Sequence, residues 1–223
     1  MVAILDTLTD ILADLRSRLQ EPTASLRTDG DLKLWLNLAL REVAERTRYF
    51  NVSVSGSSVA STGSYSLTSG TFLITRHIDA LGLKQVVYNG AEIDQAKERD
   101  LPVLRNSTSE GTPSQWFVYN GSIELFPIPS AVKTMKLYAW QYPAEMSAGA
   151  NTSGLPISKN EIIIAGAMAI ALEKDEHPDA PYYRRKYDRM VEEFVSLLED
   201  GQNRHRREGI YLDPEYERTF RNR

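Results

Sequence analysis

The sequence predicts an α+β protein in which a helical bundle of about four helices carries an inserted antiparallel β-sheet and an extended C-terminal arm. Three observations lead to this prediction. Apolar residues recur at steps of three and four near both ends of the chain, which is the spacing of a helix face. The middle of the chain contains Asn-Gly pairs between apolar runs, which is typical of β-hairpins. After Gly201 the chain becomes polar and rich in arginine.

Composition divides the 223-residue chain into four segments. We predict N-terminal helices of the bundle in residues 1–50, an inserted β domain in 51–145, C-terminal helices of the bundle in 146–201, and an arm in 202–223. A chain of this length suits one domain, or a core with an elaborated insert. The contents of 42% hydrophobic and 25% charged residues are those of a soluble globular protein.

The first two helices are expected before residue 50. In the first, the apolar residues at helical spacing are Ile4, Leu8, Ile11, Leu12, Leu15 and Leu19. Glu21-Pro22 ends this helix, because a proline disfavours the helical conformation of the residue before it. Thr28 or Asp29 is suited to cap the N-terminus of the second helix.

The stretch "LKLWLNLAL" at residues 32–40 has leucine at every second position, a spacing that is also typical of a half-buried strand. Good helix formers and no turn signal follow it, so we interpret it as a helix. At about 100° per residue, one broad apolar face forms from Leu32, Trp35, Leu36, Ala39, Leu40 and Val43. Leu34 and Leu38 lie opposite, in line with Arg41 and Glu45. Either a third helix of the bundle covers them, or they form a subunit interface.

The middle of the chain is predicted to form β-hairpins. Asn89-Gly90 and Asn120-Gly121 each separate two apolar runs, and both residue types tolerate the positive φ of a type I′ turn. A further strand is expected in residues 133–143, where polar and apolar residues alternate. Pro127 and Pro129 indicate a strand end or an edge. The sheet is expected to fold into a small sandwich or barrel.

Two more helices are predicted after residue 157. Ser158 and Glu161 have the spacing of a capping box, and the helix behind them is apolar almost all round, which indicates burial. Asp179 is expected to cap the last helix, with Pro181 in its first turn and Gly201 at its end. Its predicted inner stripe is Tyr183, Tyr187, Met190, Val191, Phe194 and Leu198.

Residues with catalytic or metal-binding chemistry are scarce. The chain has no cysteine, and His77, His177 and His205 are far apart in the sequence without the spacing of metal ligands. No nucleophile elbow, dinucleotide fingerprint or phosphate loop is present. We therefore expect no enzyme, no metal site and no cofactor. The apolar run 162–172 is shorter than the ~20 residues of a membrane span, so no membrane contact is expected.

A basic strip near the start of the last helix allows two interpretations. It consists of Arg184, Arg185, Lys186 and Arg189. A helix N-terminus disfavours cations because the macrodipole is positive there. The strip is then either a solvated face, or a surface that faces DNA or an acidic partner. The net charge of −4 provides no general reason to expect nucleic-acid binding.

The C-terminal arm combines arginine with aromatic residues, and it is more aromatic than an inert linker. Its candidate docking residues are Arg204, Arg206, Arg207, Tyr211, Tyr216 and Phe220. The arm is either disordered or folded back on its own domain, or it docks onto a partner protein or a neighbouring subunit. In the second case the arginines would pair with carboxylates of the partner, and the aromatic side chains would be buried.

Three stretches of the chain together resemble a known family. They are "DLKLWLNLALREVAERTRYF", "GTPSQWFVYNGSIELFPIPS" and "LPISKNEIIIAGAMAIALE". In this order they resemble the helix, the hairpin and the closing helices of tailed-bacteriophage head-to-tail adaptor (connector, or head completion) proteins. The resemblance extends from about residue 4 to residue 200, and it does not include the arm.

The resemblance implies a structural virion protein that forms a homo-oligomeric ring, usually twelve-fold, beneath the portal. Such a ring connects the capsid to tail or nozzle proteins in the neck of the virion, and it is assembled in the cytoplasm of the bacterial host. Viral DNA would pass through its lumen without sequence-specific binding. The alternatives are a component of the tail tube and a nucleic-acid-binding regulatory protein that uses the basic strip.

Overall fold

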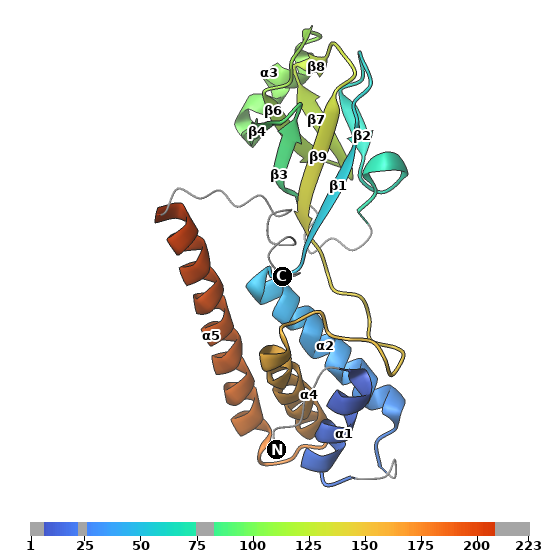
Figure 1. Cartoon of the computed structure of the whole chain (residues 1–223), viewed down its shortest axis with the longest axis vertical. Coiled ribbons are helices and arrows are strands. Elements are labelled where there is room, and N and C mark those ends of the chain that lie inside the picture. The colour runs from blue at the N-terminus through green and yellow to red at the C-terminus, as the bar shows by residue number, and fades with distance from the viewer. Residues whose placement is uncertain (1–6, 22–25, 75–82, 208–223) are drawn as a thin grey trace, which may run out of the picture. The chain divides into compact units, whose positions relative to one another are not determined.

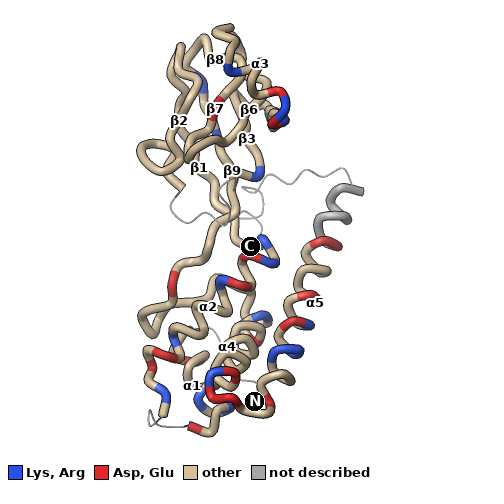
Figure 2. Tube along the Cα trace, turned by 180° about the vertical axis from the view of Figure 1, so that it is seen from behind, with Lys and Arg blue, Asp and Glu red and all other residues tan. Residues whose placement is uncertain are grey.

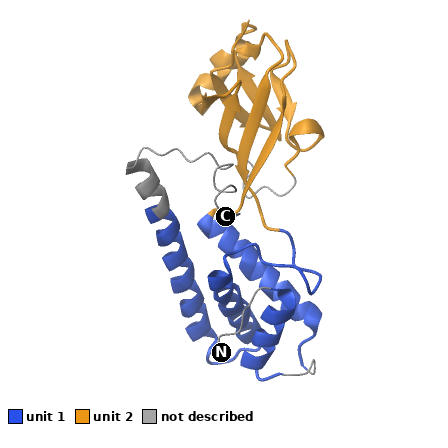
Figure 3. Cartoon of the chain, in the orientation of Figure 1, with its two compact units in different colours: residues 1–47, 144–223 blue, residues 48–143 orange. Residues whose placement is uncertain are grey.

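The structure, a computed structural model, describes residues 7–21, 26–74 and 83–207 and confirms the predicted α+β class. The chain divides into two compact units (Figure 3). The helical unit comprises Met1–Thr47 and Ala144–Arg223, and the β unit comprises Arg48–Pro143.

The helices of the helical unit (Figure 1) are α1 (Leu8–Arg18), α2 (Asp29–Thr47), α4 (Asn160–Lys174) and α5 (Ala180–Arg207), with a short 3-10 helix η3 (Ile157–Lys159) before α4. The stretch with alternating leucines is therefore a helix, as predicted. The N-cap of α2 is Thr28 rather than Asp29. The Thr28 hydroxyl accepts a hydrogen bond from the Asp31 main-chain N–H at 3.2 Å, and the Asp31 carboxylate accepts one from the Thr28 N–H at 3.1 Å. Together they form a capping box.

Helix α4 is the core of the helical unit, as its apolar sequence predicts. Its buried residues are Asn160, Ile162, Ile163, Ile164, Ala165, Gly166, Ala167, Met168, Ala169, Ala171 and Leu172. Helices α1, α2 and α5 all contact it. At Gly166 an added Cβ would lie 2.7 Å from the Ala39 Cβ and 2.9 Å from the Tyr187 ring. The Tyr187 hydroxyl is buried and donates a hydrogen bond to the Ala39 carbonyl oxygen at 3.2 Å. Helices α2, α4 and α5 thus meet at one glycine.

Two predicted helix ends are wrong. Ser158 does not cap α4, because η3 precedes the helix, and the Glu161 carboxylate is instead bound by Arg18 and Lys186. Gly201 does not end α5, which continues to Arg207. A glycine inside a helix costs only about 1 kcal/mol relative to alanine, and no proline follows it in this stretch.

The β unit contains a seven-stranded sheet in the order β1-β9-β3-β4-β6-β7-β2, which curls into a half-barrel. Its strands are β1 (Asn51–Ser57), β2 (Ser64–Ser66), β3 (Leu83–Tyr88), β4 (Ala91–Gln95), β6 (Gln115–Tyr119), β7 (Ser122–Phe126) and β9 (Thr134–Trp140). A separate pair joins β5 (Glu110–Gly111) to β8 (Ile128–Pro129). The short helices are η1 (Gly70–Phe72), η2 (Glu98–Asp100) and α3 (Leu101–Asn106).

The sheet differs from the purely antiparallel prediction at one pair of its strands, because β4 and β6 are parallel. The connection between them contains η2 and α3 and is therefore long enough for the crossover that parallel strands need. Both predicted hairpin turns are confirmed. The φ angles are 50° at Asn89 and 82° at Gly90, and 48° at Asn120 and 72° at Gly121.

One face of the curled sheet forms the core of the β unit. Along β9, Met135, Leu137 and Ala139 are fully buried, which matches the predicted alternation. The indole N–H of Trp116 is buried with them and donates to the Ile93 carbonyl oxygen at 3.0 Å. The β unit therefore has an apolar core of its own.

We predict that Gly166→Ala destabilises the helical unit. Alanine gains about 1 kcal/mol in helix propensity, but its methyl group would overlap both Ala39 and Tyr187. Overpacking of this kind typically costs about 1–3 kcal/mol, so the midpoint of urea unfolding should decrease.

Gly30→Ala is the matched control, since it is the same substitution in another helix. A Cβ at Gly30 would meet only the Thr28 Oγ1, at an ordinary 3.5 Å. Stability should be unchanged, or higher by up to about 1 kcal/mol. Equal unfolding midpoints for the two variants would disprove the close packing at Gly166.

Candidate functional site

The outer face of α2 exposes two leucines. Leu34 is 55% exposed and Leu38 is 43% exposed, whereas the opposite face of the same helix is buried. In the described part of the chain no helix covers this pair, so the alternative of a third covering helix in the same bundle is wrong.

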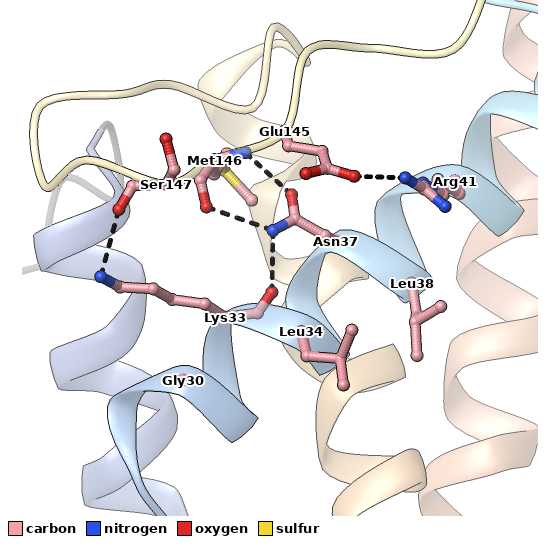
Figure 4. Close-up of a pocket in the computed structure, with 9 residues that line it drawn as sticks. All are labelled: Gly30, Lys33, Leu34, Asn37, Leu38, Arg41, Glu145, Met146 and Ser147. Carbon is pink, nitrogen blue, oxygen red and sulfur yellow. Dashed lines mark hydrogen bonds and ion pairs between the residues drawn. The ribbon is translucent and has the colours of Figure 1, made fainter.

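A segment that approaches α2 from the side makes this face into a groove (Figure 4). The Asn37 amide clamps the segment to the helix. Its nitrogen donates to the Met146 carbonyl oxygen at 3.1 Å and to the Lys33 carbonyl oxygen at 2.9 Å, and its oxygen accepts from the Met146 N–H at 2.9 Å. Met146, which belongs to this segment, is itself fully buried. One amide in α2 therefore holds one wall of the groove.

The groove has an apolar floor and a charged rim. Its volume is about 380 Å³. The lining residues are Gly30, Lys33, Leu34, Asn37, Leu38, Arg41, Glu145, Met146 and Ser147. On the rim the Lys33 ammonium donates to the Ser147 carbonyl oxygen at 3.1 Å, and the Arg41 guanidinium pairs with the Glu145 carboxylate. A surface of this kind can bind apolar side chains between charged partners, but it brings together no groups for acid–base or nucleophilic chemistry.

Three of the four residues predicted for a subunit interface line this groove: Leu34, Leu38 and Arg41. The fourth, Glu45, is exposed on the same helix but is not part of the lining. The prediction did not include Asn37 or the segment 145–147. A polar amide in a leucine-rich helix is the one sequence signal for Asn37, since such residues rarely favour helix interiors without a partner.

The basic strip on α5 is not a continuous cationic surface. The Arg184 guanidinium binds the Glu42 carboxylate through two hydrogen bonds of 2.8 and 3.3 Å, and the Lys186 ammonium binds Glu161 at 3.0 Å. Arg185 and Arg189 are exposed, and Arg189 lies 3.8 Å from Glu193. Figure 2 shows acidic residues further along the same helix. Two of the strip's four cations thus join α5 to α2 and α4.

Glu161 is the centre of an ion-pair cluster that joins three helices. Its carboxylate accepts two hydrogen bonds from Arg18 of α1, at 2.6 and 2.7 Å, and one from Lys186 of α5. Arg18 also pairs with Asp14 at 2.8 Å. Burial acts to raise the pKa of the Glu161 carboxyl, but the hydrogen bonds and charges of Arg18 and Lys186 outweigh it and hold the pKa below its ordinary value. Folding therefore favours the ionised form.

Among the histidines, His77 and the side chain of His205 lie outside the described residues, and His177 serves a local structural role. The His177 side chain accepts a hydrogen bond from the main-chain N–H of Asp179 at 3.2 Å, at the turn before α5. No group of three or more potential metal ligands is found among the residues that the structure describes. Over the same residues, no helix combines the length and the apolar character that a membrane span requires.

The candidate residues of the arm fall in two places. Arg204, Arg206 and Arg207 belong to the last turns of α5. Tyr211, Tyr216 and Phe220 lie outside the described residues.

The model of a family described as SU10 adaptor protein matches residues 6–209. No curated protein matches the chain.

We predict that Glu161→Gln lowers the free energy of unfolding at pH 7 by about 1.5–3 kcal/mol, the range for hydrogen bonds to charged groups. The folded-state pKa of Glu161 is depressed, so its contribution is complete above the ordinary glutamate pKa of about 4.3. It is lost as the pH falls through the lower folded-state value. Stability of the variant should therefore depend less on pH in the acid range, as measured by urea unfolding at a series of pH values.

Glu193→Gln provides the control, because the Glu193 side chain is 66% exposed and lies 3.8 Å from a single arginine. This variant should follow the parent chain at every pH. If Glu161→Gln lost stability with acid as steeply as the parent, the cluster would not be the origin of the acid sensitivity.

Proposed function

We propose a ring-forming role for this chain on the premise that it belongs to the SU10 adaptor protein family, whose model it matches over residues 6–209. This is a family of phage head-to-tail adaptors, so the protein is a phage virion adaptor. The family is a structural one and is not known for enzymatic activity.

The observation that carries the ring proposal is the groove on α2. Leu34 and Leu38 are exposed in the single chain, although they belong to a helix whose other face is in the core. A contact with another copy would remove this apolar surface from water at about 25 cal/mol per Å². Since a groove is not complementary to itself, the contact would join two different surfaces. Repetition of such a head-to-tail contact produces a closed ring when the rotation is suitable.

The proposed place of this ring is the virion neck, after assembly in the host cytoplasm. There it would have twelve copies, dock beneath the portal protein and receive tail or nozzle proteins. Viral DNA would pass through its lumen without sequence-specific binding. The net charge of −4 supports a channel that conducts a polyanion without gripping it, and so does the use of Arg184 and Lys186 within the bundle. That Arg185 and Arg189 face DNA or an acidic partner remains a prediction.

The two alternative functions receive no support from the described residues. A tail tube component would be dominated by β structure, whereas α1, α2, α4 and α5 form a substantial helical unit. A nucleic-acid-binding regulator would need the basic strip as a free surface, and three of its four cations lie in ion pairs with Glu42, Glu161 and Glu193.

We predict that Leu34→Asp together with Leu38→Asp leaves a folded monomer that no longer assembles. Both side chains are substantially exposed, so their replacement should not disturb the core. Burial of two unpaired carboxylates in a contact costs several kcal/mol. Circular dichroism would report the fold and native mass measurement the assembly state.

Leu197→Asp is the control, since Leu197 is 56% exposed on another helix of the same unit. It should assemble as the parent chain does. A double variant on α2 that still forms the ring would exclude Leu34 and Leu38 from the subunit contact.

We further propose that the arm reaches the portal or an adjacent subunit. Because α5 continues to Arg207, the deletion that tests the arm is that of residues 208–223. Thermal stability should be nearly unchanged, while attachment to DNA-filled heads should be lost. Truncated protein that still seals heads and supports tail joining would contradict this role.

A further inference from the structure

The groove on α2 needs an occupant with small apolar or aromatic groups and some negative charge. Its floor is Leu34 and Leu38, and its volume of about 380 Å³ is at the low end of ligand pockets, which suits one or two side chains rather than a whole helix. On the rim, Lys33 binds a main-chain carbonyl rather than a carboxylate, so a carboxylate of the occupant can pair with it.

Residues 208–223 of the chain itself have this chemistry. The segment contains three aromatic residues, Tyr211, Tyr216 and Phe220. Glu215 and Glu217 flank the second of them, so an aromatic anchor and carboxylates that can meet Lys33 are adjacent. Aromatic side chains bury a large area at a low cost in conformational entropy, which makes them effective anchors in small grooves.

Most of this segment is too far from the groove of its own chain. Helices α2 and α5 run parallel, because Arg184 pairs with Glu42, and Asp188, one turn later, pairs with Arg46. By this register Leu38 lies level with the first residue of α5.

From that level to Arg207 the helix rises about 40 Å. A fully extended chain returns at most about 14 Å by Tyr211 and about 32 Å by Tyr216. Only Phe220, at about 45 Å, can span the distance, and only without any fold in between. Two of the three aromatic residues therefore cannot reach the groove of their own chain.

We infer that the groove on α2 binds residues 208–223 of a second copy of this chain, with an aromatic side chain against Leu34 and Leu38 and a glutamate at Lys33. The inference rests on the proposed assembly of copies and assigns an occupant to its contact surface. The arm would act as a strap between neighbouring subunits. Its ordering entropy would be paid only when the subunits meet.

The absence of cysteine from the parent chain allows a direct test. One full-length variant carries Leu34→Cys and an affinity tag, and a second, untagged one carries Tyr211→Cys, Tyr216→Cys or Phe220→Cys. The two are mixed, assembled and oxidised. A disulfide forms only when the two Cα atoms come within about 7 Å. We expect at least one arm position to form the mixed disulfide several-fold more often than the control, as measured by mass under non-reducing conditions.

The control pairs each arm variant with Leu197→Cys, which is exposed on α5 and remote from the groove lining. A second comparison uses the single variants Phe220→Ser and Thr219→Ser. The two positions are neighbours, and only the first carries an aromatic side chain in the parent chain. Loss of assembly strength in the first and not in the second supports aromatic anchoring.

The possible results distinguish failure of the contact between arm and groove from failure of the ring proposal. If the parent chain forms rings but no arm position exceeds the control, the arm does not occupy the groove, and the ring proposal stands. If a chain that carries both Leu34→Cys and an arm cysteine closes on itself instead of linking two chains, the second copy is excluded. If the mixed disulfide forms but the assembly is not a ring, the groove has its occupant, and the ring proposal fails. If neither assembly nor the mixed disulfide appears, both are overturned.

Discussion

The close approach of three helices at Gly166 is the constraint on which the rest of the helical unit depends. A Cβ at this position would lie 2.7 Å from Ala39 and 2.9 Å from Tyr187, so only glycine lets α2 and α5 pack this tightly on α4. The buried Tyr187 hydroxyl, whose pKa is raised by burial, remains a protonated donor to the Ala39 carbonyl. Because α4 is apolar almost all round, it must be enclosed, and its neighbours use their apolar faces to enclose it.

The availability of the outer face of α2 follows from this enclosure. One face of α2 packs against α4, so Leu34 and Leu38 on the opposite face point away from the core. Asn37 then holds the segment 145–147 beside them and gives the exposed leucines a wall. A surface that would otherwise be two scattered leucines becomes a groove with defined edges, which is a more selective arrangement for a protein contact.

Charged residues at the start of α5 serve mainly to hold the helices together. Arg18 and Lys186 converge on Glu161, and Arg184 binds Glu42, so the arginine-rich start of α5 contributes to the packing of the bundle. This explains how cations can be placed near a helix N-terminus, where the macrodipole disfavours them, since carboxylates of other helices compensate the cost.

Local signals were sufficient for much of the secondary structure. The apolar spacing identified the four helices of the helical unit but not the short α3, the Asn-Gly pairs identified both hairpins, and the almost entirely apolar sequence of α4 predicted its burial. Each depends on residues close together in the chain. Tertiary structure alone decided the parallel pairing of β4 with β6, the partners of Glu161, and the wall of the groove that the segment 145–147 forms. The bond from Asn37 to Met146 joins residues 109 positions apart, and neither residue carries a local sign of the other.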